Sequence, residues 1–244
     1  ALCAVCIALA AYVARAVTRP INSMSRAARC FAEGQTVDGL PLARSDEIGV
    51  LARSFFRMQT QIRRQLAELQ LRREEMERLA RHDSLTGLPN RLLFAEHVGR
   101  ALTAARRDVT RLALMFIDID KFKPINDNLG HAFGDLLLAE FSARLRSVLR
   151  ESDMPARIGG DEFVVLLHTI QSEEDVMIVA EKIRHTINQP FVLEDQSLSV
   201  SACIGIALYP EDGEDLAELS RNADKAMYRA KENGRNGVAF FSHE

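Results

Sequence analysis

The sequence has no excess of basic charge, which limits the partners that the protein can have. Its 31 Lys and Arg residues are balanced by 34 Asp and Glu residues, giving a formal net charge of −3. Proteins that bind the backbone of a polynucleotide neutralise several phosphates with a basic stripe, and this sequence has none. A few placed cations can still hold single phosphates. We therefore expect a nucleotide as ligand and no polynucleotide.

Cysteine is also scarce and lacks the spacing of a metal site. Cys3 and Cys6 lie in an apolar run without a second pair or a histidine partner, and Cys30 and Cys203 stand alone. We expect all of them to be structural. Internal repeats and low-complexity tracts are absent as well. With 244 residues and 47% hydrophobic content, the chain can form one full domain with a sizeable core and a smaller second part.

The sequence does not begin with Met, and residues 1–14 carry no charge. Arg15 and Arg19 follow this apolar run, as the positive-inside rule expects of a cytoplasmic flank. We interpret residues 1–16 as the inner end of a transmembrane helix in the inner (cytoplasmic) membrane, with the remaining chain in the cytoplasm. A buried helix and a signal-peptide remnant are the alternatives. A signal peptide would carry its positive charges before the apolar run.

Two short segments after residue 16 have the apolar spacing of a coiled-coil seam. We expect the first helix to end at Gly34 and the second to be capped by Ser45 or Asp46, with a connector that includes Val37. Two such helices can bury their seams by dimerising into a parallel four-helix bundle. The seam positions are Val17, Ile21, Met24, Ala28 and Phe31 in the first helix, and Ile48, Leu51, Phe55, Met58 and Ile62 in the second.

Residues 17–63 resemble a HAMP linker domain, with Pro20 near the start and Asp-Glu-Ile-Gly at 46–49. A plain amphipathic hairpin is the alternative. The second helix is predicted to continue over residues 64–80 as a coiled-coil signalling helix. Its heptad positions are apolar at both ends and polar at Gln65 and Arg72, which lowers stability and makes pairing adjustable. A solvated spacer helix is the alternative.

From about residue 81 the pattern changes to alternating strands and helices. An apolar strand is expected at 112–119, a helix through 137–148, a strand pair around 155–168 and a helix at 172–188. A strand at 198–208, a helix at 215–233 and a short strand at 238–241 follow. The alternation is less regular than in a Rossmann fold. We therefore predict an α/β (α+β) sheet with some antiparallel pairs.

Two acidic elements carry the candidate chemistry. Asp118 and Asp120 end the apolar strand, and Asp161 follows the pair Gly159-Gly160, which suits a tight hairpin. Carboxylates that meet in one place repel each other unless a cation joins them, and such oxygen ligands suit Mg²⁺ or Mn²⁺. Taken alone, a Gly-Gly-Asp turn is most often only a hairpin.

Four motifs in order make residues 81–242 resemble the GGDEF domain of diguanylate cyclases. They read DSLTGLPNR at 83–91, DIDKFKPINDNLGH at 118–131 followed by AFGD, GGDEF at 159–163, and YRAKENGRN at 228–236. The resemblance implies a ferredoxin- or nucleotidyl-cyclase-like domain over 81–244. Its central mixed sheet would be flanked by helices and preceded by the HAMP domain and the stalk.

The resemblance also implies roles at the acidic end of the strand. Asp118, Asp161 and the backbone carbonyl of Ile119 would hold the metal, Mg²⁺ or Mn²⁺. Asp161, Glu162 and Lys123 would form the catalytic group, in which Glu162 aids metal binding or proton removal. The implied reaction is attack by the 3′-hydroxyl of one GTP on the α-phosphorus of another, with loss of pyrophosphate.

The substrate residues follow from the same motifs. Asn126 and Asp135 would bind guanine, because a carboxylate can accept hydrogen bonds from N1–H and the exocyclic amino group, an arrangement that adenine does not offer. The phosphates would be met by further residues of the pattern, namely Lys123, Lys231, Arg235, Gly159 and Gly160. Each domain would hold one GTP, so that a homodimer is needed to make cyclic di-GMP.

Arg150 and Asp153 match the R-x-x-D inhibitory site of the family, which binds the product cyclic di-GMP as an allosteric ligand. Lys182 or Arg184 is expected to add a cation there. Two alternatives to an active, membrane-anchored cyclase stay open. One is a non-catalytic GTP- or cyclic di-GMP-binding regulatory domain of a larger protein, which could carry a downstream phosphodiesterase domain. The other is a cyclase that makes a cyclic mononucleotide, which the guanine pair disfavours.

Overall fold

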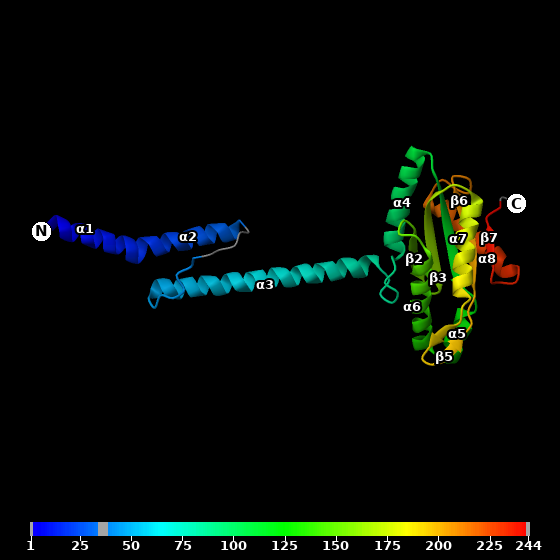
Figure 1. The fold of residues 1–244 in the computed structure, drawn as a ribbon, viewed down its shortest axis with the longest axis horizontal. Coiled ribbons are helices and arrows are strands. Elements are labelled where there is room, and N and C mark those ends of the chain that lie inside the picture. Colours follow the sequence, from blue (N-terminus) through cyan, green and yellow to red (C-terminus); the bar gives the residue numbers. More distant parts are fainter. Residues whose placement is uncertain (1, 34–38, 243–244) are drawn as a thin grey trace. The chain divides into compact units, whose positions relative to one another are not determined.

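The computed structural model describes residues 2–33 and 39–242. The chain forms two compact units, one up to Met76 and one from Glu77 onward. Figure 1 shows helices alone in the first unit, and a sheet with helices in the second. Gly34 and Val37, expected to end the first helix and to form the connector, lie outside the described residues.

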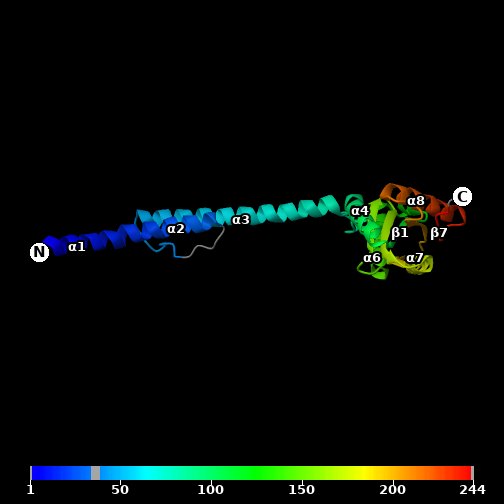
Figure 2. The same ribbon diagram turned by 90° about the horizontal axis from the view of Figure 1, so that it is seen from above.

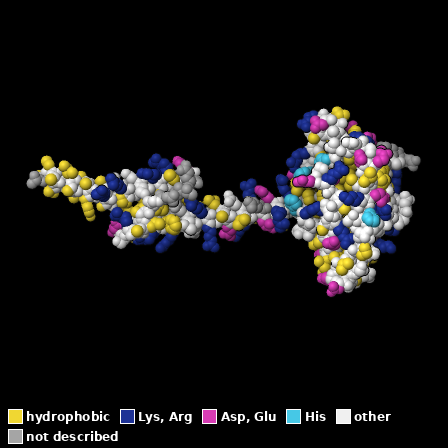
Figure 3. Space-filling model, viewed as in Figure 1, with side chains coloured by type: hydrophobic (Ala, Val, Ile, Leu, Met, Phe, Trp, Pro, Cys, Tyr) yellow, Lys and Arg dark blue, Asp and Glu magenta, His cyan; other side chains and the backbone are white. Residues whose placement is uncertain are grey.

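The N-terminal helix is continuous and apolar at its start. It consists of α1 (Leu2–Val13), a π-helical stretch η1 (Ala14–Thr18) and α2 (Arg19–Ala32). No residue of α1 is buried, and Figure 3 shows hydrophobic side chains gathered over it. By length and composition Leu2–Ala32 can cross a membrane, a test that a signal sequence also passes. Because exposed apolar surface is unfavourable in water, the apolar side chains of α1 favour burial in an apolar environment.

The two predicted seams meet within the first unit. Phe31 of α2 packs edge to face on Phe55 of α3 (Glu47–Arg81), with ring centroids 6.3 Å apart. Within the single chain Ala27 is buried and the predicted seam residue Ala28 is exposed. The chain leaves other seam side chains exposed, namely Val17, Ile21, Leu51 and Met58.

Asp46 caps α3, which decides between the two caps that the sequence allows. Its carboxylate accepts a hydrogen bond of 3.1 Å from the Gly49 amide and also binds the Arg44 guanidinium. The bond from Arg44 lowers the pKa of Asp46 to about 2. From this cap α3 runs to Arg81 without a break. Apolar side chains in its second half are exposed, including Leu66, Leu69, Leu71, Met76 and Leu79.

A five-stranded mixed sheet forms the centre of the second unit. The strand order is β2-β3-β1-β6-β7, with every pair antiparallel except the parallel pair β6 and β7. The strands are β1 (Arg111–Ile119), β2 (Met154–Gly159), β3 (Glu162–Ile170), β6 (Ala202–Tyr209) and β7 (Val238–Phe240). The predicted mixed sheet with antiparallel pairs is confirmed.

Helices cover both faces of this sheet. Figure 2 shows α8 (Leu216–Glu232) on one side of the strands, with α6 (His131–Val148) and α7 (Glu173–Ile187) on the other. β1 is central and contributes to both cores: Leu112 and Leu114 pack with α4 (Arg91–Asp108) and α8, whereas Met115 and Ile117 pack with α6 and α7. The end of β1 therefore has a fixed position between the two layers.

Several elements were not predicted. No helix was predicted at α4 or at α5 (Phe122–Leu129), and no hairpin at β4 (Phe191–Leu193) and β5 (Gln196–Leu198). The strand predicted over 198–208 is shorter: Leu198 ends β5, and β6 begins at Ala202. α5 has only 8 residues, too few for a helical period to stand out.

Close packing of α8 on β6 gives a test of the fold. A Cβ atom at Gly205 would overlap the Ala223 carbonyl oxygen and the Met227 amide nitrogen of α8. Gly205→Ala is therefore expected to lower the free energy of unfolding by about 1–3 kcal/mol, as overpacking does. Gly99→Ala in α4 is the control, because a Cβ there meets nothing within 4 Å. Urea unfolding followed by circular dichroism checks both, and equal effects would contradict this packing.

Candidate active site

The Gly-Gly-Asp segment forms the tight turn between β2 and β3. Gly159 pairs with Glu162 across the hairpin, and Gly160 has a φ of +47°, which suits glycine. Arg157, at the end of β2, donates hydrogen bonds to the Gly160 carbonyl oxygen from Nε at 2.9 Å and from Nη2 at 2.7 Å. The guanidinium group thus holds the turn from its own strand.

A second motif braces the same guanidinium group. Arg157 Nη1 lies 2.9 Å from Asp83 Oδ1, which also accepts hydrogen bonds from the Thr86 amide and hydroxyl at 2.9 and 2.7 Å. Burial raises the pKa of Asp83, but the bonds from Thr86 and Arg157 outweigh it and leave the pKa below its ordinary value. Residues 83–86 therefore act as a structural brace for the turn at Gly160.

The predicted acidic residues meet in a pocket of about 230 Å³ at the end of β1. Asp118 Oδ1 lies 2.9 Å from Lys231 Nζ of α8. Burial is the largest cause that raises the pKa of Asp118; Lys231 lowers it, and the charges of Asp161 and Asp120 raise it further. The predicted residues in this pocket are Asp118, Ile119, Lys123, Asp161, Lys231 and Arg235.

Glu162 does not line this pocket, whereas Asp120 does line it, with a carboxylate that is held by protein donors. Glu162 lines a separate cavity between α4 and α8, together with Phe94 and Phe116. The Asp120 carboxylate is buried and accepts hydrogen bonds from Ser201, Cys203 and the Asn236 amide. Burial and the bond to Asp120 raise the pKa of Cys203 to about 11, which keeps its thiol protonated as a donor.

The pocket residues fit a divalent cation that is shared with a substrate. Asp118 and Asp161 bring two like charges to one pocket, and Lys231 is the cation that now lies against Asp118. Within residues 2–33 and 39–242, no group of three or more His, Cys, Asp or Glu side chains could hold a metal alone. Mg²⁺ is commonly held by one or two carboxylates together with substrate phosphates and water, which matches this donor set.

The predicted guanine pair lies on the two helices that follow the pocket. Asn126 of α5 packs on Gly134 of α6, where a Cβ atom would overlap its side-chain oxygen, and Asp135 is the next residue. The Asn126 Oδ1 atom is buried without a hydrogen-bond partner. Asp135 is exposed. The exposed Asp135 carboxylate can accept two N–H donors of a planar ligand.

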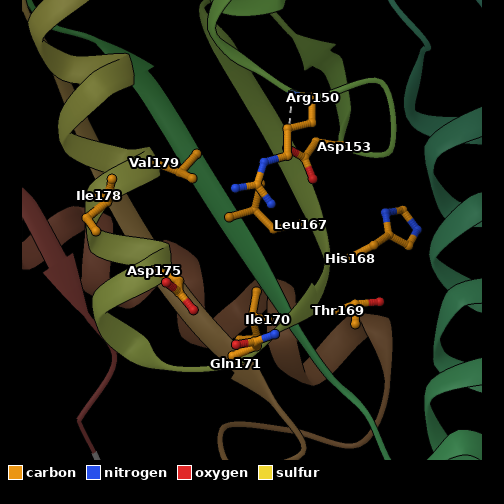
Figure 4. A pocket seen from close by; sticks show the side chains of 10 residues that line it. All are labelled: Arg150, Asp153, Leu167, His168, Thr169, Ile170, Gln171, Asp175, Ile178 and Val179. Carbon is orange, nitrogen blue, oxygen red and sulfur yellow. Dashed lines mark hydrogen bonds between the residues drawn. The ribbon is translucent and has the colours of Figure 1, made fainter.

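Arg150 and Asp153 line another pocket, of about 320 Å³, between β3 and α7. The Arg150 amide donates to Asp153 Oδ2 at 3.1 Å, and Figure 4 shows the two side chains at one end of the pocket, with Leu167 and Val179 beside them. Of the two extra cations considered, Lys182 lies near this segment and donates to the Val148 carbonyl oxygen at 3.2 Å. Arg184 instead binds Glu181 and Asn236.

Comparison with known families agrees with this arrangement. The sequence model described as "Diguanylate cyclase, GGDEF domain" matches residues 80–237, and the HAMP domain model matches residues 12–64. The chain belongs to the GGDEF family. Both resemblances inferred from the motifs, a HAMP linker followed by a GGDEF domain, are confirmed.

Two relatives from Pseudomonas aeruginosa are similar in sequence. The bifunctional diguanylate cyclase/cyclic di-GMP phosphodiesterase MucR is 48% identical over 167 residues, which are 68% of this chain and 24% of MucR. The diguanylate cyclase TpbB is 39% identical over 241 residues, which are 96% of this chain and 55% of TpbB. The GGDEF-family chain therefore spans little more than half of TpbB and about a quarter of MucR.

Solved GGDEF structures have the same fold. The crystal structure of the GGDEF domain of TpbB matches with a TM-score of 0.64 and 45% sequence identity. The match covers 65% of the present chain and 99% of the TpbB domain. The coiled coil and GGDEF domain of DgcB from Caulobacter crescentus, solved in complex with c-di-GMP, has a TM-score of 0.65 and 27% identity. The match covers 75% of the present chain and 98% of the DgcB chain.

Sequence reasoning missed the residues that hold this GGDEF site together. Asp83 belongs to the motif at 83–91 and Arg157 lies two residues before the GGDEF motif, and no role was predicted for either, although they connect segments 74 positions apart. Asp120 was grouped with the metal carboxylates, whereas its oxygens accept hydrogen bonds from protein donors. The signal that could have found the Asp83 brace is an aspartate three residues before a threonine, a pattern typical of a side-chain-capped turn.

The brace at the GGDEF turn makes a pH-dependent contribution to stability. Because the folded state lowers the pKa of Asp83, its stabilisation is present above the unfolded pKa of about 3.9 and is lost as pH falls through the folded value. Asp83→Asn is expected to lower the free energy of unfolding by about 1–2 kcal/mol at neutral pH, and by less near pH 3. Urea unfolding at both pH values measures this.

Asp108→Asn is the matched control, since Asp108 also pairs with an arginine, Arg107, but the pair is exposed. Solvent screening makes such pairs weak, so this variant should unfold like the wild type at both pH values. A pH-independent loss in Asp83→Asn would contradict the assigned role of the carboxylate.

Proposed function

We propose that the protein is a diguanylate cyclase that condenses two GTP molecules into cyclic di-GMP and two pyrophosphates. The observation that carries the proposal is the pocket in which Asp118 and Asp161 lie with Lys231 and Arg235. Paired carboxylates next to cations suit a metal-bound triphosphate. In each half-reaction the 3′-oxygen of one GTP forms a bond to the α-phosphorus of the other. The bond from that phosphorus to the pyrophosphate group breaks, and the hydroxyl proton is released.

The chain's own residues would orient the triphosphate. Asp118, Asp161 and the Ile119 carbonyl would hold Mg²⁺ or Mn²⁺, which supplies activation of the hydroxyl and stabilises charge on the phosphate oxygens. Lys231 now neutralises Asp118 at 2.9 Å. Together with Lys123 and Arg235, it would bind the phosphates by charge-assisted hydrogen bonds. Glu162 begins β3 directly after Asp161, and its role as a catalytic aide remains part of the proposal.

Guanine selection would rest on Asn126 and Asp135. The Asp135 carboxylate is exposed and able to accept from N1–H and the exocyclic amino group of guanine. The Asn126 side chain, whose oxygen has no partner, lies beside it. Adenine cannot offer the same pair of donors, so that ATP would leave the carboxylate unpaired. A Cβ atom added at Gly159 would meet no other atom within 4 Å, so that the backbone there is open to the substrate.

A dimer would bring two such half-sites together. Each domain would hold one GTP, and ring closure needs two. The seam side chains Leu51 and Met58 are 58% and 47% exposed in the single chain, which favours burial against a second copy of the linker. We propose the inner end of a membrane helix at 1–16, the HAMP domain at 17–63, the signalling helix at 64–80 and the catalytic domain at 81–244. The apolar helix α1 would anchor this dimer to the inner membrane.

Product inhibition is the proposed role of the second pocket. Arg150 and Asp153 would bind cyclic di-GMP through its guanine and phosphate groups. The solved complex of DgcB contains c-di-GMP, and the present chain is 27% identical to it. Lys182, which lies near Val148, would supply the further cation.

The reaction can be tested with the full chain in detergent micelles, incubated with GTP and Mg²⁺ and analysed by ion-exchange separation of nucleotides. Wild type is expected to form cyclic di-GMP and pyrophosphate from GTP, and no product from ATP. Asp161→Asn should lower the rate by about 100-fold or more, because a charge that stabilises the transition state is lost. Circular dichroism of the variant should be unchanged.

Arg150→Ala removes the proposed inhibition and guards against a false negative result. It should form cyclic di-GMP at least as fast as the wild type and should be insensitive to added product. Failure of both the wild type and Arg150→Ala to form cyclic di-GMP would contradict the proposal. GTP binding without turnover would then point to a regulatory domain, and a cyclic mononucleotide would point to the other kind of cyclase.

A further inference from the structure

Asp120 is a buried carboxylate that the proposed reaction does not use. It is 7% exposed and follows the last residue of β1. Oδ2 accepts hydrogen bonds from Ser201 Oγ at 2.6 Å and from the Asn236 amide at 3.0 Å, and Oδ1 accepts one from Cys203 Sγ at 3.1 Å. Ser201 directly precedes β6 and Cys203 lies near its start, whereas Asn236 lies in the loop between α8 and β7. Asp120 therefore ties this loop to the sheet.

The loop at residues 234–236 has an unfavourable backbone conformation. Gly234, Arg235 and Asn236 have φ values of +108°, +63° and +46°. Residues other than glycine cost about 1–3 kcal/mol each in this region, and they adopt it where the surrounding structure holds them. All three residues are exposed, so that buried apolar contacts do not fix the loop.

Hydrogen bonds at Asn236 replace the missing packing. Its amide donates to Asp120, and its side-chain oxygen accepts from Asn188 Nδ2 at 2.9 Å and Arg184 Nη1 at 3.2 Å at the end of α7. Arg235 is the residue before this anchor, and its own amide donates to the Ala230 carbonyl oxygen at 3.2 Å. The direction of the Arg235 side chain thus depends on how Asn236 is held.

Arg235 lines the same pocket as Asp118, Lys231 and Asp120 itself. We propose that Asp120 is a positioning residue, whose buried carboxylate fixes the loop at Asn236 and so places Arg235 against the substrate phosphates. The proposal rests on the proposed function, because it takes the triphosphate of GTP as the ligand of Arg235. Two other roles are possible for such a carboxylate: a direct metal ligand, or a purely structural bond. Its three protein donors argue against the first.

A double-mutant cycle separates positioning from plain stabilisation. The full chain in detergent micelles is titrated with a GTP analogue that has a methylene group between the α- and β-phosphates, so that pyrophosphate cannot leave. Arg235→Ala should weaken binding by about tenfold, the loss of one charge-assisted hydrogen bond. Asp120→Ala should weaken it by a similar factor, and the double variant should be no weaker than Arg235→Ala alone.

Three measurements make the test specific. Guanosine, which lacks phosphates, should bind wild type and Asp120→Ala equally. Asp120→Asn should restore analogue binding to within about threefold of wild type, because its amide oxygen can accept from Ser201 and Asn236 while its amino group faces the Cys203 sulfur. Asp212→Ala is the matched control, a carboxylate of similar burial that accepts the Leu208 amide at the opposite end of β6. It should bind the analogue like wild type.

Additive losses in the cycle would overturn the proposal, as would an equal loss in Asp212→Ala or weaker guanosine binding by Asp120→Ala. If Asp120→Ala does not fold, Ser201→Ala replaces it in the cycle and should lower affinity by about twofold only when Arg235 is present. Because the cycle measures binding without turnover, it is independent of the assay for cyclic di-GMP. A chain that binds the analogue but forms no cyclic di-GMP would contradict the proposed function and leave this inference standing.

Discussion

Repulsion between Asp118 and Asp161 is the constraint on which the rest of the site depends. The fold places the two carboxylates in one pocket and partly buries Asp118, which raises its pKa. Two like charges in such a place are unfavourable unless a cation joins them. In the free protein that cation is the ammonium group of Lys231. The exchange of this internal cation for a divalent metal and a triphosphate is the physical basis of the proposed activity.

Holding the carboxylates together requires rigid support from distant segments. β1 ends between two helical layers, which fixes Asp118, while Arg157 and Asp83 hold the turn that carries Asp161. Asp120 ties the loop that carries Arg235 to β6. Each support is a buried or half-buried hydrogen-bonded charge, so that loss of one partner leaves the other unsatisfied. The pocket is therefore sensitive to residues that do not line it, such as Arg157 and Asp83.

The motifs and the apolar periods were sufficient to predict the HAMP and GGDEF assignments and the mixed sheet. The pocket lined by Asp118, Asp161 and Lys231 agrees with the motifs, and the roles of these residues stay predictions. Prediction failed where a helix was too short to show its period, and where a contact joined residues far apart in the sequence. The eight-residue helix α5 is too short to show a period. Asp120 could not be separated from Asp118 by sequence, because its hydrogen-bond donors lie 81 to 116 positions away. For the same reason, the pattern could not show that Glu162 faces a different cavity from Asp161.

The central claim is that Asp118 and Asp161 form one half of a shared metal site. Electron paramagnetic resonance of Mn²⁺ tests it most directly, with the full chain in detergent and the methylene analogue of GTP present. We predict a bound Mn²⁺ signal in the wild type, and its loss in both Asp118→Asn and Asp161→Asn while circular dichroism stays unchanged. Mn²⁺ binding of equal strength in the wild type and both variants would contradict the account.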